Sequence, residues 1–172
     1  MKRGFILCLC VFLFSGLQAQ NLTTEDMFKD YFSKHQDSLD EIEGIWSVSG
    51  SQEFYRYDTL YDVIKISKAA KVAVIEKDGK YDSYNLTGES YDAQFFPTET
   101  KGVYFYTIEF PETQEHSKTD AVINKEGSME YKYEFPDKYL RFKLGDTYEE
   151  GTFVTNELKW TKVFPEPPKK KK

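Results

Sequence analysis

The sequence predicts an all-β fold, an antiparallel meander of short strands preceded by one amphipathic helix. From Ile45 onward apolar side chains recur at every second position, which is the period of a strand with one buried face. Turn-forming pairs such as Asp78-Gly79 divide this region at hairpin spacing. A meander of eight to ten strands leaves exposed edges unless it closes or folds over itself. We therefore expect a closed barrel, with a sandwich as the alternative.

The chain begins with a segment typical of a secretory signal peptide. Lys2 and Arg3 precede an apolar run from Phe5 to Phe14, and Ala19 supplies a small residue close to the expected cut. A membrane-spanning helix needs about twenty apolar residues, roughly twice the length of this run. We expect residues 1–20 to be removed, and the mature protein to be periplasmic or extracellular with no transmembrane segment.

Removal of this segment changes the composition of what remains. Both cysteines, Cys8 and Cys10, would be lost, so the mature chain could form no disulfide and no cysteine metal site. The net charge would fall from −6 to −8, since 21 basic residues would face 29 acidic ones. Nucleic-acid binding requires a basic face, so we expect no nucleic-acid partner. Aromatic residues, 17% of the chain, can supply the core.

One helix is expected, between Thr23 and Ile42, within an N-terminal segment of residues 21–43. Thr23 and Asp26 resemble a capping box, and aromatic residues recur at three- and four-residue steps, with His35 on the same face. The barrel is expected over residues 44–164. The Pro- and Lys-rich residues 165–172 are expected to form a disordered tail.

Strand periodicity suggests which side chains face the barrel interior. Residues 129–135 and 140–144 alternate between apolar and polar side chains, and residues 103–110 are aromatic on both faces and are expected to be covered on both sides. We take four of these aromatic residues as candidate ligand-lining positions: Phe105, Tyr131, Tyr133 and Phe142.

The residues that usually perform catalysis are nearly absent from the mature chain. His35 is expected to pack on the helix and His116 to lie in a polar loop, and there is no Gly-x-Ser-x-Gly motif. We therefore expect no enzyme, no cofactor and no metal. Acidic residues cluster at the helix end without the glycine turn of a calcium loop, and we expect them to form a solvated face: Asp37, Asp40, Glu41 and Glu43.

Gly44-Ile45-Trp46 resembles the Gly-x-Trp motif at the start of the first strand in lipocalins. The resemblance implies an eight-stranded barrel that holds an apolar ligand, with Trp46 closing one end. It also implies structural roles for Gly44 and Trp46, and a basic residue packed on the tryptophan. Arg141 is the nearest candidate for that basic residue.

A second resemblance covers more of the chain. The order of residues 42–46, 71–79 and 158–165 is similar to small β modules in exported proteins of Bacteroidetes. It implies no named activity, but it favours an alternative to ligand carriage. In that alternative the domain has a solid core and binds an envelope or surface protein through exposed strands such as Phe54–Tyr57. The expected partner is therefore either an apolar small molecule or an envelope protein.

Overall fold

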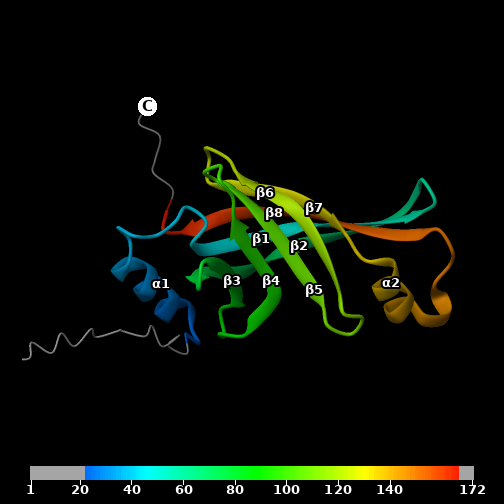
Figure 1. Ribbon diagram of the computed structural model, residues 1–172, viewed down its shortest axis with the longest axis horizontal. Coiled ribbons are helices and arrows are strands. Elements are labelled where there is room, and N and C mark those ends of the chain that lie inside the picture. The colour runs from blue at the N-terminus through cyan, green and yellow to red at the C-terminus, as the bar shows by residue number, and fades with distance from the viewer. Residues whose placement is uncertain (1–21, 167–172) are drawn as a thin grey trace, which may run out of the picture.

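The computed structural model describes residues 22–166 and shows a closed antiparallel barrel (Figure 1). Eight strands follow one another in chain order around the wall, and the last pairs with the first. The all-β barrel prediction is thereby confirmed, and the sandwich alternative is wrong. The strands are β1 (Gly44–Arg56), β2 (Thr59–Lys77), β3 (Lys80–Asn85), β4 (Ser90–Pro97), β5 (Val103–Phe110), β6 (Glu115–Ile123), β7 (Ser128–Glu134) and β8 (Thr152–Phe164).

Helix α1 (Glu25–Lys34) precedes the barrel, as predicted, but it ends eight residues earlier than expected. Thr24, not Thr23, is its N-cap, since the Thr24 hydroxyl accepts the N–H of Met27 at 3.3 Å. The aromatic stripe of the helix packs on the outside of the first two strands. The buried members of this outer cluster are Phe28, Phe32, Ile45 and Ala73.

A second helix, α2 (Asp137–Leu144), replaces a strand that the sequence predicted. Leu140 and Leu144 are four residues apart, a spacing that suits a helix as well as a strand. Leu140 is buried, whereas Phe142 is 57% exposed. The short 3-10 turn η1 (Gly145–Thr147) follows α2. Helices α1 and α2 lie at opposite ends of the molecule (Figure 1).

The barrel wall is uneven. Strand β2 has 19 residues but pairs with β3 only over Val72–Lys77, so the rest of β2 pairs with β1 alone. The β1–β2 hairpin therefore extends beyond the other strands, alongside β8 (Figure 1). Strands β6 and β7 pair at only two positions, near Ile123, and separate toward α2. These departures leave the α2 end of the barrel more open than the α1 end.

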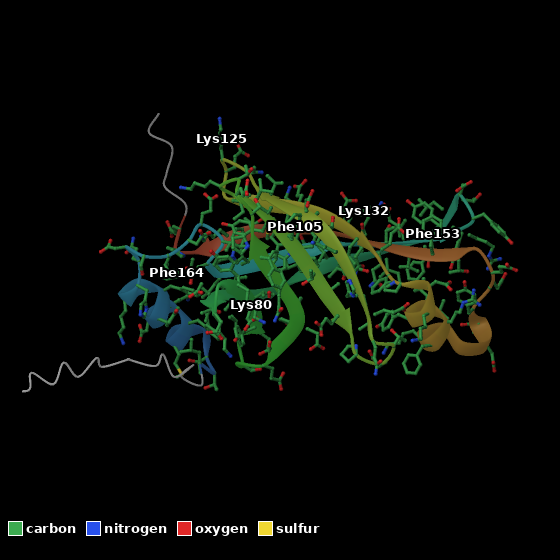
Figure 2. The ribbon with its side chains drawn as sticks, in the orientation of Figure 1. Lys80, Phe105, Lys125, Lys132, Phe153 and Phe164 are labelled. Carbon is green, nitrogen blue, oxygen red and sulfur yellow. The ribbon has the colours of Figure 1, made fainter. Side chains whose placement is uncertain are left out.

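Strand β5 shows which face of the sheet points inward. Tyr104, Tyr106 and Phe110 are buried within the core, whereas Phe105 is 38% exposed on the outer face (Figure 2). The expectation that this strand is covered on both sides is wrong. The predicted hairpin at Asp78-Gly79 is confirmed, because both residues have positive φ (55° and 79°), as a tight two-residue turn requires.

Candidate ligand-binding cavity

A cavity of about 440 Å³ lies inside the barrel on the α2 side. Most of its apolar wall comes from the neighbouring strands β8, β1 and β2 and from β5, which is not paired with any of them. The residues concerned are Val48, Val72, Tyr106, Ile108, Phe110 and Trp160. Protein sites for small molecules have volumes of roughly 300–1,000 Å³ and mainly apolar walls. The cavity therefore has the size and the lining of a small-molecule site.

The α1 end of the barrel is closed by Trp46. Its side chain is fully buried, and its indole N–H donates to the Ile42 carbonyl at 2.8 Å. Gly44 allows the strand to begin here, because its φ is 141° and a Cβ would lie 2.3 Å from the Phe164 carbonyl oxygen. The Lys162 ammonium lies 5.3 Å from the centre of the Trp46 ring, close enough for a cation–π contact.

Lys162, on β8, therefore occupies the position that was predicted for Arg141. Its ammonium also donates to the Glu41 carbonyl at 2.6 Å, and burial lowers its pKa. Arg141 lies on α2, where it forms an ion pair with Asp137 at 2.7 Å. The prediction for Arg141 is wrong because residues 137–144 are helical and turn away from the α1 end.

An aromatic layer forms the floor of the cavity. The Phe95 and Trp160 rings meet edge to face at 5.6 Å, and the Tyr106 and Tyr131 rings lie 4.5 Å apart. The Tyr131 hydroxyl is buried beside Tyr106 and Trp160 without forming a hydrogen bond of normal geometry. Burial raises the pKa of Tyr131 well above its ordinary value, so this hydroxyl is neutral at physiological pH.

The mouth of the cavity combines an aromatic collar with acidic side chains. Phe110, Phe135 and Tyr139 pack together there, with ring centres 4.4 to 5.6 Å apart. Asp92, Glu109 and Glu112 are among the residues of this region, and the Glu112 carboxylate forms an ion pair with Lys143 at 3.0 Å. Among the described lining residues there is no lysine, arginine or histidine. Charged groups of both signs therefore stand at the rim, since the Lys143 ammonium lies 5.4 Å from the centre of the Tyr139 ring.

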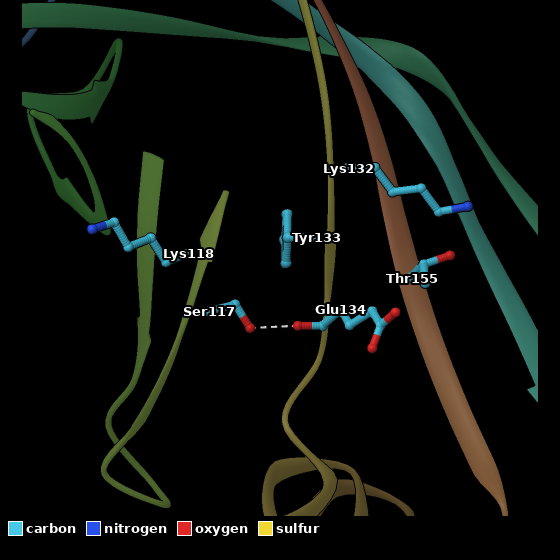
Figure 3. A pocket seen from close by; sticks show the side chains of 6 residues that line it. All are labelled: Ser117, Lys118, Lys132, Tyr133, Glu134 and Thr155. Atoms are coloured by element: carbon cyan, nitrogen blue, oxygen red, sulfur yellow. Dashed lines mark hydrogen bonds between the residues drawn. The ribbon is translucent and has the colours of Figure 1, made fainter. Parts of the chain in front are cut away.

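A second hollow, of about 360 Å³, lies in the wall where β6 and β7 separate (Figure 3). The Ser117 hydroxyl donates to the Glu134 carbonyl across this gap. Lys132 is already paired with Glu53 at 2.6 Å, and the Lys118 ammonium lies over the Phe105 ring at 4.1 Å. Because its cations are engaged, this polar groove is the weaker candidate site.

The four predicted lining residues are divided between these regions. Tyr131 lies inside the barrel beneath the cavity, and Tyr133 borders the side groove, where its hydroxyl accepts from Asn156 at 2.6 Å. Phe105 is on the outer face and Phe142 is exposed on α2, so neither lines the barrel. Those two predictions are wrong.

The acidic residues after α1 do not form the solvated face that was expected. The Asp40 carboxylate accepts the Ile42 N–H at 3.1 Å and the Tyr104 hydroxyl. The Glu43 carboxylate is buried and accepts the backbone N–H of Asp40 at 2.9 Å and of Glu76 at 3.2 Å. Burial raises the pKa of Glu43. These carboxylates tie the segment after α1 to the barrel.

Neither histidine lines the cavity. His35 ends α1 with its Nδ1 2.8 Å from the Tyr31 carbonyl oxygen, and His116 is exposed on β6 rather than in a loop. Among residues 22–166, no three His, Cys, Asp or Glu side chains are grouped so as to hold a metal ion. Within the same range, no helix has the length and apolar character needed to cross a membrane.

Sequence reasoning missed most of the cavity wall. On β5 the choice of face could have been made from the sequence, because three aromatic residues share one face with Ile108 while Phe105 stands alone on the other. Trp160 and Ser83 carry no comparable local signal. Their position opposite other strands depends on the closure of the barrel.

The closed eight-stranded antiparallel barrel is compatible with the lipocalin-like fold that the Gly-x-Trp motif implied. In comparisons with known proteins, no family model, no curated protein and no solved structure matches this chain. The candidate site is therefore defined by its own geometry.

Proposed function

We propose that this chain is an exported binding protein that holds an apolar or aromatic small molecule inside its barrel. The cavity carries the proposal, since its mainly apolar wall opens at the α2 end and its far end is sealed by Trp46. Export is inferred from the signal-like pattern of residues 1–20, which lie outside the described residues. A periplasmic or extracellular carrier is the role that joins these two features.

We propose binding rather than catalysis for this site. The titratable residues that line the cavity are acidic residues and tyrosines, and neither histidine is placed to act as a base in the cavity. Nucleophilic catalysis requires a base beside the nucleophile. The cavity supplies walls and hydrogen-bonding groups, which position a molecule without activating it.

A cavity-filling variant tests the proposal. Ala93 is buried and lines the cavity, so Ala93→Phe places a ring in the space that a ligand would occupy. The uncharged fluorophore N-phenyl-1-naphthylamine serves as the probe, with Val122→Phe as a control because Val122 is 50% exposed on the outer face of β6. We expect Ala93→Phe to weaken probe binding at least about tenfold, or about 1.4 kcal/mol, and the control to leave it unchanged.

Equal probe affinity in Ala93→Phe and the wild type would refute binding in the barrel. Thermal unfolding of each variant shows whether the fold is retained, because overpacking a core costs about 1–3 kcal/mol. Organic extraction of the protein purified from its producing cells, followed by mass spectrometry, then identifies any natural occupant.

A second candidate function is protein binding through the protruding hairpin, and one observation favours it. Five large apolar side chains, each at least 41% exposed, lie at the hairpin end: Tyr57, Leu60, Tyr61, Val63 and Ile64. Interaction surfaces are often apolar patches of this kind. Part of the predicted Phe54–Tyr57 segment is already engaged, since Tyr55 stacks on Phe153 at 4.6 Å and Arg56 pairs with Glu149 at 2.7 Å.

This second candidate predicts that charge placed within the apolar patch of the hairpin abolishes binding of the partner. Pull-down from the envelope fraction should recover a partner with the wild type and lose it with the double variant Leu60→Lys and Ile64→Lys. Thr59→Lys, an exposed change of a polar residue on the same hairpin, is the matched control. A partner retained equally by all three proteins would contradict a role for the hairpin.

A further inference from the structure

The inner face of the β1–β2 hairpin continues the wall of the cavity. Val48 and Ala70 line the cavity and are paired with each other across β1 and β2. Toward the hairpin end, Ile66 pairs with Gly50, which is two residues from Val48, and Ile64 follows on the same face. Residues directly opposite each other in an antiparallel pair point to one face, and every second residue of a strand returns to that face. Ile66 and Ile64 therefore lie on the face that forms the cavity wall.

Pairing with β8 gives the same orientation. Gly50 pairs with Leu158, which packs against the core, and Phe54 pairs with Val154, which is 2% exposed. The Tyr61 ring lies 6.3 Å from the Phe54 ring, at the end of the hairpin. These inner-face side chains form a strip that we call the apolar track, and its members are Ile66, Ile64, Phe54 and Tyr61.

The apolar track is open to solvent. Ile64 is 49% exposed and Tyr61 is 51% exposed, although both are large apolar side chains. Among residues 22–166, β3 pairs with β2 only from Val72 onward, so β1 is the sole strand paired beside the track. The inner face also carries Asp62, whose carboxylate is turned back to accept the Val63 N–H at 2.8 Å. An uncovered apolar strip that leads out of an apolar cavity favours a molecule that occupies both.

The register of the hairpin gives the length of such a molecule. The β1 partners of Val72 and Ile64 are Trp46 and Gln52, which are six residues apart. At about 3.3 Å per residue, the inner end of the cavity wall on β2 lies about 20 Å from Ile64. An extended alkyl chain advances about 1.25 Å for each carbon–carbon bond, so a chain of about sixteen carbons spans this distance. A chain of about eight carbons fills the cavity and leaves the track empty.

We propose that the ligand is a long-chain amphiphile whose alkyl chain begins in the cavity and continues along the apolar track toward Tyr61. Its polar head group lies at the hairpin end, where Arg56 and Asp58 are exposed. This inference rests on the proposed ligand-binding function and names the class of ligand.

Three lysophosphatidylcholines that differ only in chain length test the inference: the octanoyl, lauroyl and palmitoyl compounds. Each is titrated below its critical micelle concentration as a competitor of N-phenyl-1-naphthylamine. Removing one methylene group from water improves affinity by up to about fourfold. Four methylene groups separate the lauroyl chain from the palmitoyl chain, and an open track buries about half of their surface. We therefore expect the palmitoyl compound to bind at least about tenfold more tightly than the lauroyl compound.

Two variants of neighbouring residues separate the track from the rest of the hairpin. Ile64 and Val63 are both β-branched residues of β2, 49% and 41% exposed, but Val63 pairs with Glu53 on the outer face. We expect Ile64→Ser to reduce the preference for the palmitoyl over the lauroyl compound to within about threefold, and to leave the affinity for the octanoyl compound unchanged. Val63→Ser is the matched control and should change neither value.

The failures of the two proposals are distinguishable. The inference is overturned, while ligand binding in the barrel stands, if the octanoyl compound displaces the fluorophore but the palmitoyl compound binds no more tightly than the lauroyl compound. It is also overturned if Ile64→Ser keeps the full preference, or if both variants reduce it equally. If neither the fluorophore nor any of the three compounds binds, the proposed function fails and the inference fails with it.

Discussion

The two tryptophans of this domain are both buried, but among residues 22–166 only Trp46 has a partner in normal hydrogen-bond geometry for its indole N–H. This difference predicts that the same substitution will have unequal effects at the two positions. Trp→Phe removes similar apolar area from both sites, so the packing losses largely cancel in a comparison. What remains is the hydrogen-bond difference, together with the cation–π contact that Trp46 alone makes, with Lys162, and both act in the same direction.

The magnitude follows from the state of each N–H in the ligand-free protein. Trp46→Phe leaves the buried Ile42 carbonyl without its donor, which costs about 1–3 kcal/mol. Trp160→Phe removes an unpartnered buried donor, which recovers a penalty of about 1–3 kcal/mol. The two contributions add, so we expect Trp46→Phe to be less stable than Trp160→Phe by about 4 kcal/mol, or by about 12 °C in Tm for a domain of this size.

Urea unfolding of the two variants, monitored by far-ultraviolet circular dichroism, measures this difference. The proteins are first refolded from denaturant so that no ligand carried through purification stabilises either one. Equal destabilisation of the two variants, to within about 0.5 kcal/mol, would refute the reasoning. Such a result would mean that ordered water satisfies the Trp160 N–H in the free protein.

The remaining predictions concern buried hydroxyls and pH. Tyr131→Phe removes a hydroxyl without a hydrogen-bond partner, so it should leave the free energy of unfolding unchanged or raise it by about 1 kcal/mol. Tyr104→Phe should lower the free energy of unfolding by about 1–3 kcal/mol, because the Tyr104 hydroxyl donates to Asp40. Urea titration of the two variants measures both values. Burial raises the pKa of Tyr81 to about 12 from its ordinary value of 10, so its contribution to stability is complete below pH 10 and is lost as the pH rises toward 12. Unfolding measured across this alkaline range should show the loss, and Tyr81→Phe should make the loss smaller. Burial lowers the pKa of Lys162, so burying its charge destabilises the fold at any pH below its folded pKa. The free energy of unfolding should therefore increase as the pH rises from that pKa to 10.5. Lys162→Met should lack this increase, and an identical pH profile for wild type and variant would contradict the prediction.

Local patterns in the sequence predicted the parts of the fold that depend on neighbouring residues. The alternation of residues 129–135 gave a strand with Tyr131 and Tyr133 inward, because side chains alternate along any extended chain. The Asp78-Gly79 pair gave a hairpin, because few other pairs adopt positive φ twice in succession. The start of the barrel at Gly44 was read from the Gly-x-Trp motif.

The wrong predictions share a different origin. Alternation shows that Phe105 and Tyr106 point to opposite faces, and only the comparison of the two whole faces, with Ile108 and three aromatic residues on one, indicates the interior. Residues 137–144 carry spacings compatible with both helix and strand, and packing of Leu140 at the α2 end decides between them. The basic residue over Trp46 comes from a strand more than a hundred residues later.

By itself, therefore, the sequence determined an all-β meander behind one helix, an aromatic core and an acidic body. Each of these follows from composition or from a period of a few residues. The tertiary structure alone decided that the interior holds a cavity, that Trp160 lies in its wall, and that Lys162 covers Trp46. The reason is physical: strands distant in the chain come to face one another only when the barrel closes, and no local pattern encodes which side chains then meet.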